Sequence, residues 1–202
     1  MTKIKLCGLS RACDIEAANE LRPEYIGFVF ARESRRYISP EKAAELKLLL
    51  HPNIKAVGVF VNESLQNVAE LLENGVIDIA QLHGNEDDEY IKKLRALTDK
   101  TIIKAFRVCC EQDVTNANES TADFILLDSG AGTGTVFDWN RISKIDRPYF
   151  LAGGLDTENV RKAIKTVKPF AVDVSSGIEK NGVKDQTKMA AFVAAVRKEE
   201  TI

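Results

Sequence analysis

Two residues able to exchange protons stand where apolar runs of the chain end. Cys7 closes the run that begins at Ile4, and Asp128 closes the run that begins at Phe124. A thiolate is a competent base, and a buried carboxyl group needs a partner or a function because isolated buried charge is costly. Together they suggest general acid–base chemistry on a small molecule. Considered singly, Cys7 fits a core position and Asp128 a structural hydrogen bond to loop amides.

Two more polar residues follow apolar runs in the same way. Arg36 lies in Ser34-Arg35-Arg36-Tyr37, and a guanidinium can hold a carboxylate by two parallel hydrogen bonds. His83 lies in Gln81-Leu82-His83-Gly84 and is able to orient a substrate. The alternatives are a solvated surface arginine and a histidine that hydrogen-bonds a loop.

The last two apolar runs end in glycine and serine residues, which are Gly153, Gly154, Ser175, Ser176 and Gly177. Glycine lets the backbone approach a ligand closely, and barrels often hold a phosphate between their last two loops. We therefore expect a phosphate site there, with two ordinary turns as the alternative. A further glycine-rich run, Gly130–Gly134, follows Asp128 and fits either a flap over the site or a plain connection.

These residues need elements that bring their strand ends to one place. Short β-rich runs recur along the chain and begin near Ile4, Tyr25, Ala56, Ile79, Thr101, Phe124, Tyr149 and Ala171. Most are continuously apolar, as in strands buried on both faces of a parallel sheet. Helical stripes, such as Leu65, Val68, Ala69 and Leu72, fill the gaps between them.

Eight βα units predict an α/β fold, a closed (β/α)8 TIM barrel, in preference to an open doubly wound sheet. Residues 1–202 are expected to form one such domain. The polar, poorly patterned segment Glu111–Ser120 predicts a short or irregular fifth helix. Barrel chemistry sits at the C-terminal strand ends, so Cys7 on the first strand and Asp128 on the sixth would face each other across the mouth.

Composition argues against several classes of function. The net charge of −2 gives no basic footprint for nucleic acid, and no apolar run approaches the ~18 residues of a membrane span. The N-terminus lacks the apolar core of a signal peptide. Four cysteines without a CxxC pair and two histidines give no metal-ligand spacing. We expect a reduced, cytoplasmic protein without a metal, a nucleic-acid partner or a membrane.

Jointly, the motifs resemble the phosphoribosylanthranilate isomerase family. The matching stretches run in order over nearly the whole chain: Lys5–Ser10, Gly27–Phe30, Ser34–Pro40, Val57–Asn62, Gln81–Gly84, Leu127–Asp128, Gly132–Gly134, Phe137–Trp139, Leu151–Leu155 and Phe170–Glu179. Several are weak alone, but the set is specific. The chain departs from the family pattern at Ser10 (usually threonine), at Ala131 in the glycine-rich loop, and at Asn181-Gly182 (commonly Pro-Gly).

The resemblance implies an enzyme of tryptophan biosynthesis that catalyses an Amadori rearrangement. N-(5-phosphoribosyl)anthranilate would become 1-(2-carboxyphenylamino)-1-deoxyribulose 5-phosphate. Asp128 would be the general acid, Cys7 the general base, and Arg36 the clamp on the anthranilate carboxylate. The other implied substrate ligands are His83 and, for the phosphate, Gly153, Gly154, Ser175, Ser176 and Gly177. The resemblance implies no cofactor and a small-molecule phosphosugar as partner; monomer and homodimer both stay open.

Both of these catalytic groups start in the wrong ionisation state. At pH 7 a free cysteine is only about 3% thiolate, and a free aspartate is protonated about one time in a thousand. Burial and a nearby thiolate both raise an aspartate pKa. The same closeness raises the cysteine pKa, so a positive group is required, and Arg36 or a helix N-terminus are the candidates.

Three other hypotheses lead to different expectations. The histidine-pathway aminoaldose isomerase usually uses two aspartates on a longer chain; Cys7 argues against it without excluding dual specificity. A non-catalytic phosphometabolite-binding barrel would keep the glycine and serine loops but has no need of Cys7, Asp128 and Arg36 together. A thiol redox protein requires a resolving cysteine, and Cys13 forms no CxxC pair with Cys7.

Overall fold

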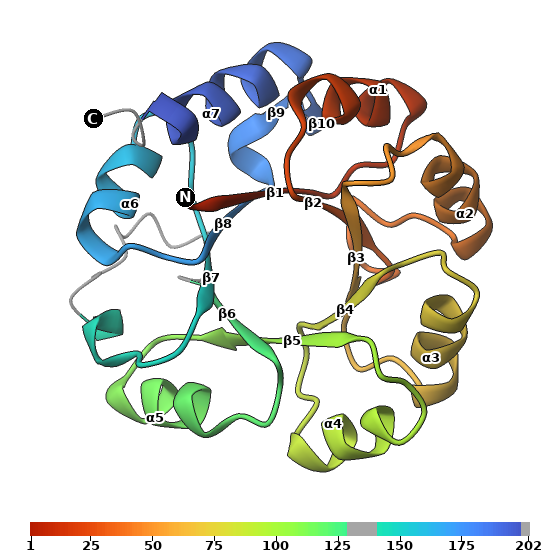
Figure 1. Cartoon of the computed structure of the whole chain (residues 1–202), viewed down its shortest axis with the longest axis vertical. Helices are drawn as coiled ribbons and strands as arrows, with labels where there is room; N and C mark the ends of the chain where they lie inside the picture. Colours follow the sequence, from red (N-terminus) through yellow and green to blue (C-terminus); the bar gives the residue numbers. More distant parts are fainter. Residues whose placement is uncertain (129–140, 199–202) are drawn as a thin grey trace.

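Eight parallel strands close into a ring, and the helices lie around its outside (Figure 1). The computed structural model describes residues 1–128 and 141–198, so the glycine-rich run Gly130–Gly134 and Trp139 lie outside the described residues. The ring closes where the last strand pairs with the first, with Lys5 in register with Asp173. The closed barrel predicted from the sequence is therefore confirmed, and the open sheet is excluded.

The elements alternate along the chain as strand and helix. The barrel strands are β1 Lys3–Cys7, β2 Tyr25–Val29, β3 Lys55–Phe60, β4 Ile79–Leu82, β5 Thr101–Arg107, β6 Phe124–Asp128, β7 Tyr149–Ala152 and β8 Ala171–Val174. The α-helices are α1 Ala12–Leu21, α2 Pro40–Leu49, α3 Leu65–Glu73, α4 Asp88–Arg95, α5 Glu111–Glu119, α6 Val160–Val167 and α7 Gln186–Lys198. Two 3₁₀ helices, η1 Arg141–Lys144 and η2 Ser176–Ile178, and a small hairpin, β9 Glu179–Lys180 with β10 Val183–Lys184, complete the described chain.

The side chains of β1 alternate between two environments. Ile4 and Leu6 belong to the large core between strands and helices. Because side chains on a strand alternate between faces, Lys3, Lys5 and Cys7 point the other way, into the barrel. The first strand therefore carries a column of polar groups inside a barrel whose walls are otherwise largely apolar.

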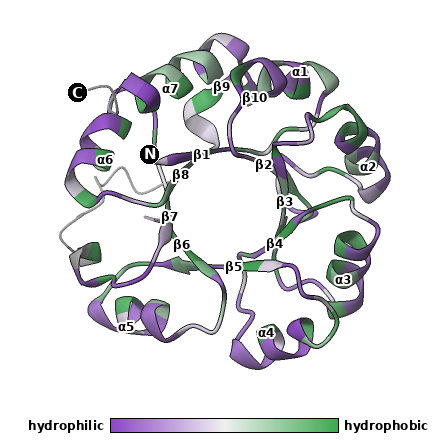
Figure 2. Ribbon diagram, in the orientation of Figure 1, coloured by the Kyte–Doolittle hydropathy of each residue, from purple (hydrophilic) through white to green (hydrophobic). Residues whose placement is uncertain are grey.

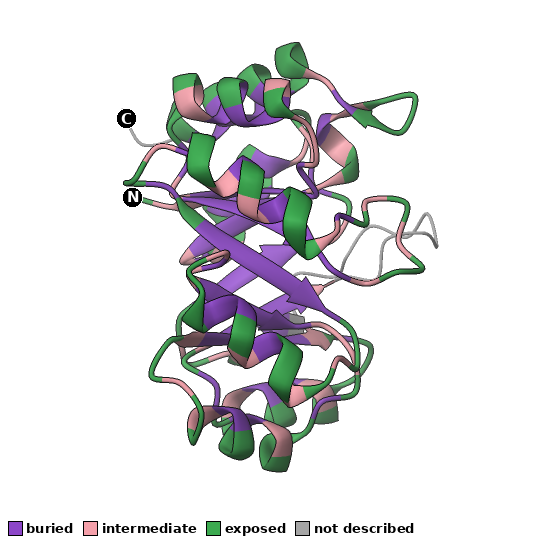
Figure 3. Cartoon of the chain, turned by 90° about the vertical axis from the view of Figure 1, so that its right-hand side faces the viewer, coloured by how far each residue is buried: buried purple, intermediate pink, exposed green. Residues whose placement is uncertain are grey.

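Several helices begin where a side chain caps the first turn, and each helix buries apolar residues. Ser39 precedes Pro40 and accepts from the backbone N–H of Lys42, and Ser64 and Asp87 cap α3 and α4 in the same way. Hydrophilic residues colour much of the outer ring in Figure 2. Figure 3 shows buried strands inside helices whose outer faces are exposed. The helix ring thus shields the strands from water.

The expectation of a short or irregular fifth helix is confirmed for length. The helix α5 has nine residues, the same as α3 and one more than α4 or α6. It begins regularly, because the Asp113 carboxylate accepts from the backbone N–H groups of Cys109 and Cys110. Among the described residues, the least regular connection follows β6, where a 3₁₀ helix is seen in place of an α-helix.

An aromatic cluster fills the N-terminal end of the barrel, opposite the mouth. Phe150 packs edge-on against Tyr25, with ring centroids 5.3 Å apart, and also contacts Phe124 and Phe170. The ammonium of Lys3 lies 4.5 Å from the centre of the Phe170 ring. These rings close one end of the barrel, which leaves the other end for a site. Within the described ranges no helix has the length and apolar character needed to cross a membrane.

Phe150→Ala should lower the free energy of unfolding by about 3–5 kcal/mol, because it removes a fully buried ring from the aromatic cluster. Phe150→Leu refills most of the space and should lose clearly less. Chemical denaturation measures both. The turnover number of each folded variant should stay near that of the parent, since the cluster lies opposite the mouth. Equal destabilisation by the two substitutions would contradict the packing account.

Candidate active site

A cavity of about 580 Å³ opens at the C-terminal ends of the strands. Of the residues singled out from the sequence, those that line it are Cys7, Arg36, His83, Asp128, Gly153, Gly154, Ser175 and Ser176. They come from six strand ends that the closed barrel brings together. A neighbouring cavity of about 710 Å³ shares His83 and Asp128 but extends over β5 and reaches neither Cys7 nor the glycine and serine loops. We therefore take the first cavity as the site.

Cys7 lies at the bottom of this cavity and is 8% exposed. Its thiol packs beside Val29 and Val59 in the barrel interior. Burial raises the pKa of the Cys7 thiol, the positive charge of Lys5 opposes that rise, and the carboxylate of Asp173 adds to it. Lys184 is a second cation that lowers the thiol pKa. Two of the cations beside the thiol are thus lysines that the sequence analysis did not single out.

Lys5 is fully buried two residues before Cys7. Its Nζ atom lies 2.7 Å from Oδ2 of Asp173, on the neighbouring strand β8. Burial alone would lower the pKa of Lys5, but the charges of Asp173 and Cys7 outweigh it and raise the pKa. The lysine therefore stays charged inside the barrel.

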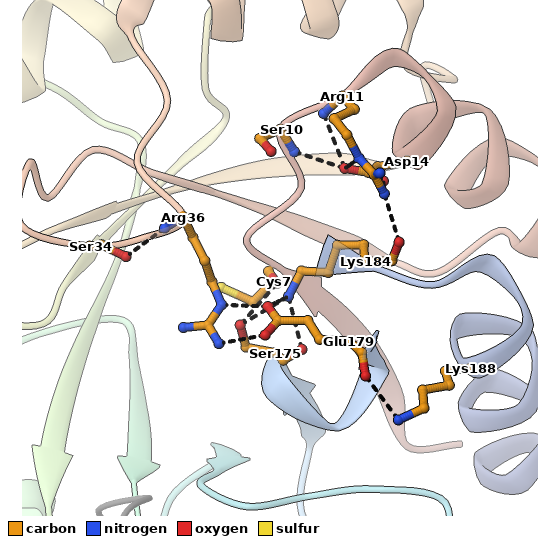
Figure 4. A network of polar contacts seen from close by, with 10 residues as sticks. All are labelled: Cys7, Ser10, Arg11, Asp14, Ser34, Arg36, Ser175, Glu179, Lys184 and Lys188. Atoms are coloured by element: carbon orange, nitrogen blue, oxygen red, sulfur yellow. Dashed lines mark hydrogen bonds and ion pairs between the residues drawn. The ribbon is translucent and has the colours of Figure 1, made fainter. Parts of the chain in front are cut away.

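Arg36 reaches the site from the loop after β2. Its side chain crosses Gly8, whose φ of +81° and missing side chain leave room: a Cβ there would lie 2.6 Å from Cδ of Arg36. The guanidinium donates from Nε and one Nη to the two carboxylate oxygens of Glu179, at 2.6 and 2.9 Å. The other Nη points away from Glu179 (Figure 4). One edge of the guanidinium is therefore fixed, and the other faces the cavity.

Lys184 links this arginine to the loop after β8 (Figure 4). Its ammonium donates to Oε1 of Glu179 at 2.6 Å and to the carbonyl oxygen of Ser175 at 2.8 Å. The Ser175 hydroxyl in turn donates to the carbonyl oxygen of Cys7 at 3.2 Å. Burial lowers the pKa of Lys184, although the carboxylate of Glu179 acts to raise it. Burial would raise the pKa of Glu179, but Arg36 and Lys184 hold it below its usual value.

Asp128 stands at the end of β6 beside His83. Nε2 of His83 lies 3.4 Å from Oδ2 of Asp128, and Nδ1 lies 2.9 Å from the side-chain nitrogen of Gln81. Because the amide nitrogen donates, Nδ1 accepts, and in neutral His83 the proton is on Nε2, facing Asp128. His83 therefore touches the carboxyl group as well as lining the cavity.

The loops after β7 and β8 fit together through their glycines. Gly153 and Gly154 have φ values of +91° and +63°, in the left-handed region that glycine adopts readily. A Cβ at Gly177 would lie 2.0 Å from the carbonyl oxygen of Leu155, so only glycine allows the two loops to touch. Gly177 does not line the cavity. The backbone of the loop after β7 occupies the space that a side chain at this position would need.

Five site residues were not singled out from the sequence: Lys5, Gln81, Asp173, Glu179 and Lys184. Three of them carried a readable signal, because each stands two positions before a strand-end residue that was recognised: Lys5 before Cys7, Gln81 before His83, and Asp173 before Ser175. That spacing places both members of each pair on one face of the strand. Glu179 and Lys184 come from the β9–β10 hairpin and had no comparable signal.

The site offers proton transfer and anion binding. Among the described residues, no group of three or more His, Cys, Asp or Glu side chains is arranged to hold a metal ion. Oε1 of Gln81 and Oδ1 of Asp173 are buried acceptors without a hydrogen-bond partner in residues 1–128 and 141–198. Both side chains line the cavity, so a bound molecule with hydroxyl or amine donors fits them.

Comparison with known proteins identifies the family of this chain. The sequence model of the N-(5'phosphoribosyl)anthranilate (PRA) isomerase family matches residues 4–195. The chain is 42% identical to the N-(5'-phosphoribosyl)anthranilate isomerase of Endomicrobium trichonymphae, over 98% of this chain and 99% of that protein. It is 45% identical to the enzyme of Caldanaerobacter subterraneus, over 98% of each chain.

Solved structures give the same result. The phosphoribosyl anthranilate isomerase of Thermotoga maritima superimposes with a TM-score of 0.86 at 37% identity, covering 98% of this chain and all of that one. A complex of such an isomerase with reduced 1-(o-carboxyphenylamino)-1-deoxyribulose 5-phosphate superimposes with a TM-score of 0.84 at 36% identity, with coverage of 98% and 100%. The resemblance inferred from the sequence is confirmed: the chain belongs to the N-(5'-phosphoribosyl)anthranilate isomerase family and is an isomerase of tryptophan biosynthesis.

Proposed function

We propose that this isomerase acts by general acid–base catalysis, with Asp128 as the acid and Cys7 as the base. The observation that carries the proposal is that both residues line one cavity, from strands three apart in the closed ring. A substrate between them meets a proton donor on one side and an acceptor on the other. The substrate is N-(5-phosphoribosyl)anthranilate, and the reaction is its Amadori rearrangement.

Two proton transfers convert the aminoaldose into an enolamine, which then becomes the aminoketose as a proton is added at C1 and the proton of the C2 hydroxyl is lost. Asp128 protonates the ring oxygen of the ribose, the bond from C1 to that oxygen breaks, and the anthranilate nitrogen forms a Schiff base with C1. Cys7, as thiolate, removes the proton from C2, and the electron pair moves into the Schiff base to give an enolamine. The enolamine tautomerises to the 2-ketone. The Nε2–H of His83 faces Asp128 and helps to hold the carboxyl group in position.

Burial is compatible with this role for Cys7 because cations lie beside it. A buried thiol resists ionisation, and Lys5 and Lys184 both oppose that effect. The resting group is therefore a thiol that two positive charges help to ionise.

The remaining contacts divide among the parts of the substrate. Gly153, Gly154 and Ser176, which line the cavity, offer backbone N–H groups to the phosphate, while the hydroxyl of Ser175 already donates to the carbonyl oxygen of Cys7. The cavity-facing edge of Arg36 donates to the anthranilate carboxylate in the bidentate geometry typical of such pairs. Oε1 of Gln81 and Oδ1 of Asp173, which have no hydrogen-bond partner among the described residues, accept from the ribose hydroxyls. A phosphosugar that carries a carboxylate fits each of these groups.

We also propose that residues 1–202 act as one domain, in the cytoplasm and without a cofactor. The T. maritima relative is described as a dimeric enzyme from which monomers were generated, so both monomer and homodimer are compatible with this barrel.

Cys7→Ala should lower kcat by roughly 10²–10⁴-fold, because it removes the general base. Steady-state turnover of phosphoribosylanthranilate measures the loss. Cys13→Ala, in α1, is the matched control and should keep full activity. Near-normal turnover by a folded Cys7→Ala protein would remove Cys7 from the mechanism.

The dependence of kcat/KM on pH should rise toward the alkaline side. Burial raises the pKa of Cys7, so the active thiolate is depleted below that pKa and gained as pH increases through it. Rates measured between about pH 6 and about pH 10 should rise with a midpoint at or above the usual thiol pKa near 8.5. A flat profile across that range would contradict a thiol base.

Arg36→Ala should raise KM, by a loss of roughly 2–5 kcal/mol in substrate binding if the carboxylate pair is desolvated. The neighbouring Arg35→Ala, at an exposed position of the same loop, is the control and should leave KM unchanged. An analogue that lacks the anthranilate carboxylate tests the assignment, because it should bind parent and Arg36→Ala equally. A preference of the parent for that analogue would show that Arg36 holds another part of the substrate.

A further inference from the structure

We propose that Lys5 is a positioning residue for catalysis: its buried ammonium stabilises the thiolate of Cys7, and Asp173 holds that ammonium in place. The inference rests on the proposed role of Cys7 as base and adds the charge that makes the role possible. The three residues occupy neighbouring positions inside the barrel, on β1 and β8.

The geometry places the lysine directly below the thiol. Lys5 and Cys7 are two residues apart on one strand, so their side chains leave the same face. Asp173 is the residue in register with Lys5 on β8, and its Oδ2 atom accepts from Nζ at 2.7 Å. An ammonium carries three hydrogens, and this carboxylate oxygen takes one. The others remain for the groups nearer the mouth, of which Cys7 is the next on the strand.

A purely structural ion pair does not explain this placement. Buried pairs add little to stability, because desolvating two charges offsets their attraction. Many other inward positions of the barrel are filled by apolar side chains such as Val57, Ile103 and Leu126. Burying a lysine among such side chains costs free energy unless its charge has a function. Lys5 lies beside Cys7, which must become negative to act as a base, and stabilising that negative charge is such a function.

Other charged groups face Cys7, and each is accounted for. Lys184 on β10 also lowers the thiol pKa, but its ammonium is shared with Glu179 and Ser175. Arg36, after β2, is engaged on one edge by Glu179. From across the mouth, the cavity is lined by Asp128 on β6 and by His83 after β4. Lys5 opposes the effect of burial on the thiol more than Lys184 does.

The test is the pH dependence of alkylation of Cys7 by iodoacetamide in the free protein, with Cys13, Cys109 and Cys110 replaced by serine. Only the thiolate reacts, so the rate follows its population. Lys5→Met should slow alkylation at pH 7 by roughly tenfold or more, with the rate recovered at higher pH. Asp173→Asn keeps a side-chain oxygen that accepts from Lys5 but removes a negative charge beside the thiol, so it should shift the profile the opposite way. Lys5→Arg keeps a positive charge at this position and should retain the alkylation profile of the parent.

Lys104→Met is the matched control. Lys104 is also buried, and its ammonium lies 3.1 Å from Glu86. Its loss should cost comparable stability while leaving the alkylation profile of Cys7 in place. If Lys5→Met does not fold, Lys5→Gln, which keeps a hydrogen-bond donor for Asp173, carries the same test.

The outcomes separate this inference from the proposed function. An unchanged alkylation profile in folded Lys5→Met or Lys5→Gln would overturn the role of Lys5, whatever the role of Cys7 in turnover. Full turnover by Cys7→Ala would overturn the base assignment, while the alkylation profile would still report the effect of Lys5 on the thiol. A parallel fall in kcat/KM and in alkylation rate, both recovered at alkaline pH, supports the two together.

Discussion

The ion pair between Lys5 and Asp173 joins the strands at which the barrel closes. Its partners lie 168 residues apart, on the first and the last strand of the ring. Closure fixes the mouth, because only in a complete ring do the ends of β1 and β6 face each other. The same pair sets the charge beneath Cys7. One contact thus serves both ring closure and the electrostatics of the site, because it places a buried positive charge, costly by itself, beside the Cys7 thiol.

A second set of contacts builds the rim of the site from the end of the chain. Glu179 holds both Arg36 and Lys184, and Lys184 holds Ser175 (Figure 4). The arginine is thereby fixed along one edge before any substrate arrives, so little of its side-chain freedom is left to lose on binding. A rigid donor edge next to a thiol and a carboxyl group is a preorganised environment for a charged substrate.

The sequence was sufficient for the architecture and for the strand-end residues. Apolar runs at regular spacing predict the barrel, and polar residues at the ends of those runs predict Cys7 and Asp128, since the fold gathers the ends in one place. The inward-facing polar residues were missed because the strands were treated as continuously apolar, whereas β1 alternates. The contact of Glu179 with Arg36 spans 143 residues and follows no local pattern, so it required the structure. The cations expected beside Cys7 were Arg36 or a helix end; the structure adds Lys5 and Lys184.

The hairpin that follows β8 has a consequence for the order in which the protein matures. Cys7 is synthesised more than 160 residues before its partners Asp173 and Lys184. Until they emerge, β1 has one unpaired edge and its inward lysine has no counter-charge. Until then, the thiol of Cys7 lacks the Asp173 and Lys184 charges that lie beside it in the folded barrel. The electrostatic environment of this thiol is therefore completed in the same step as ring closure.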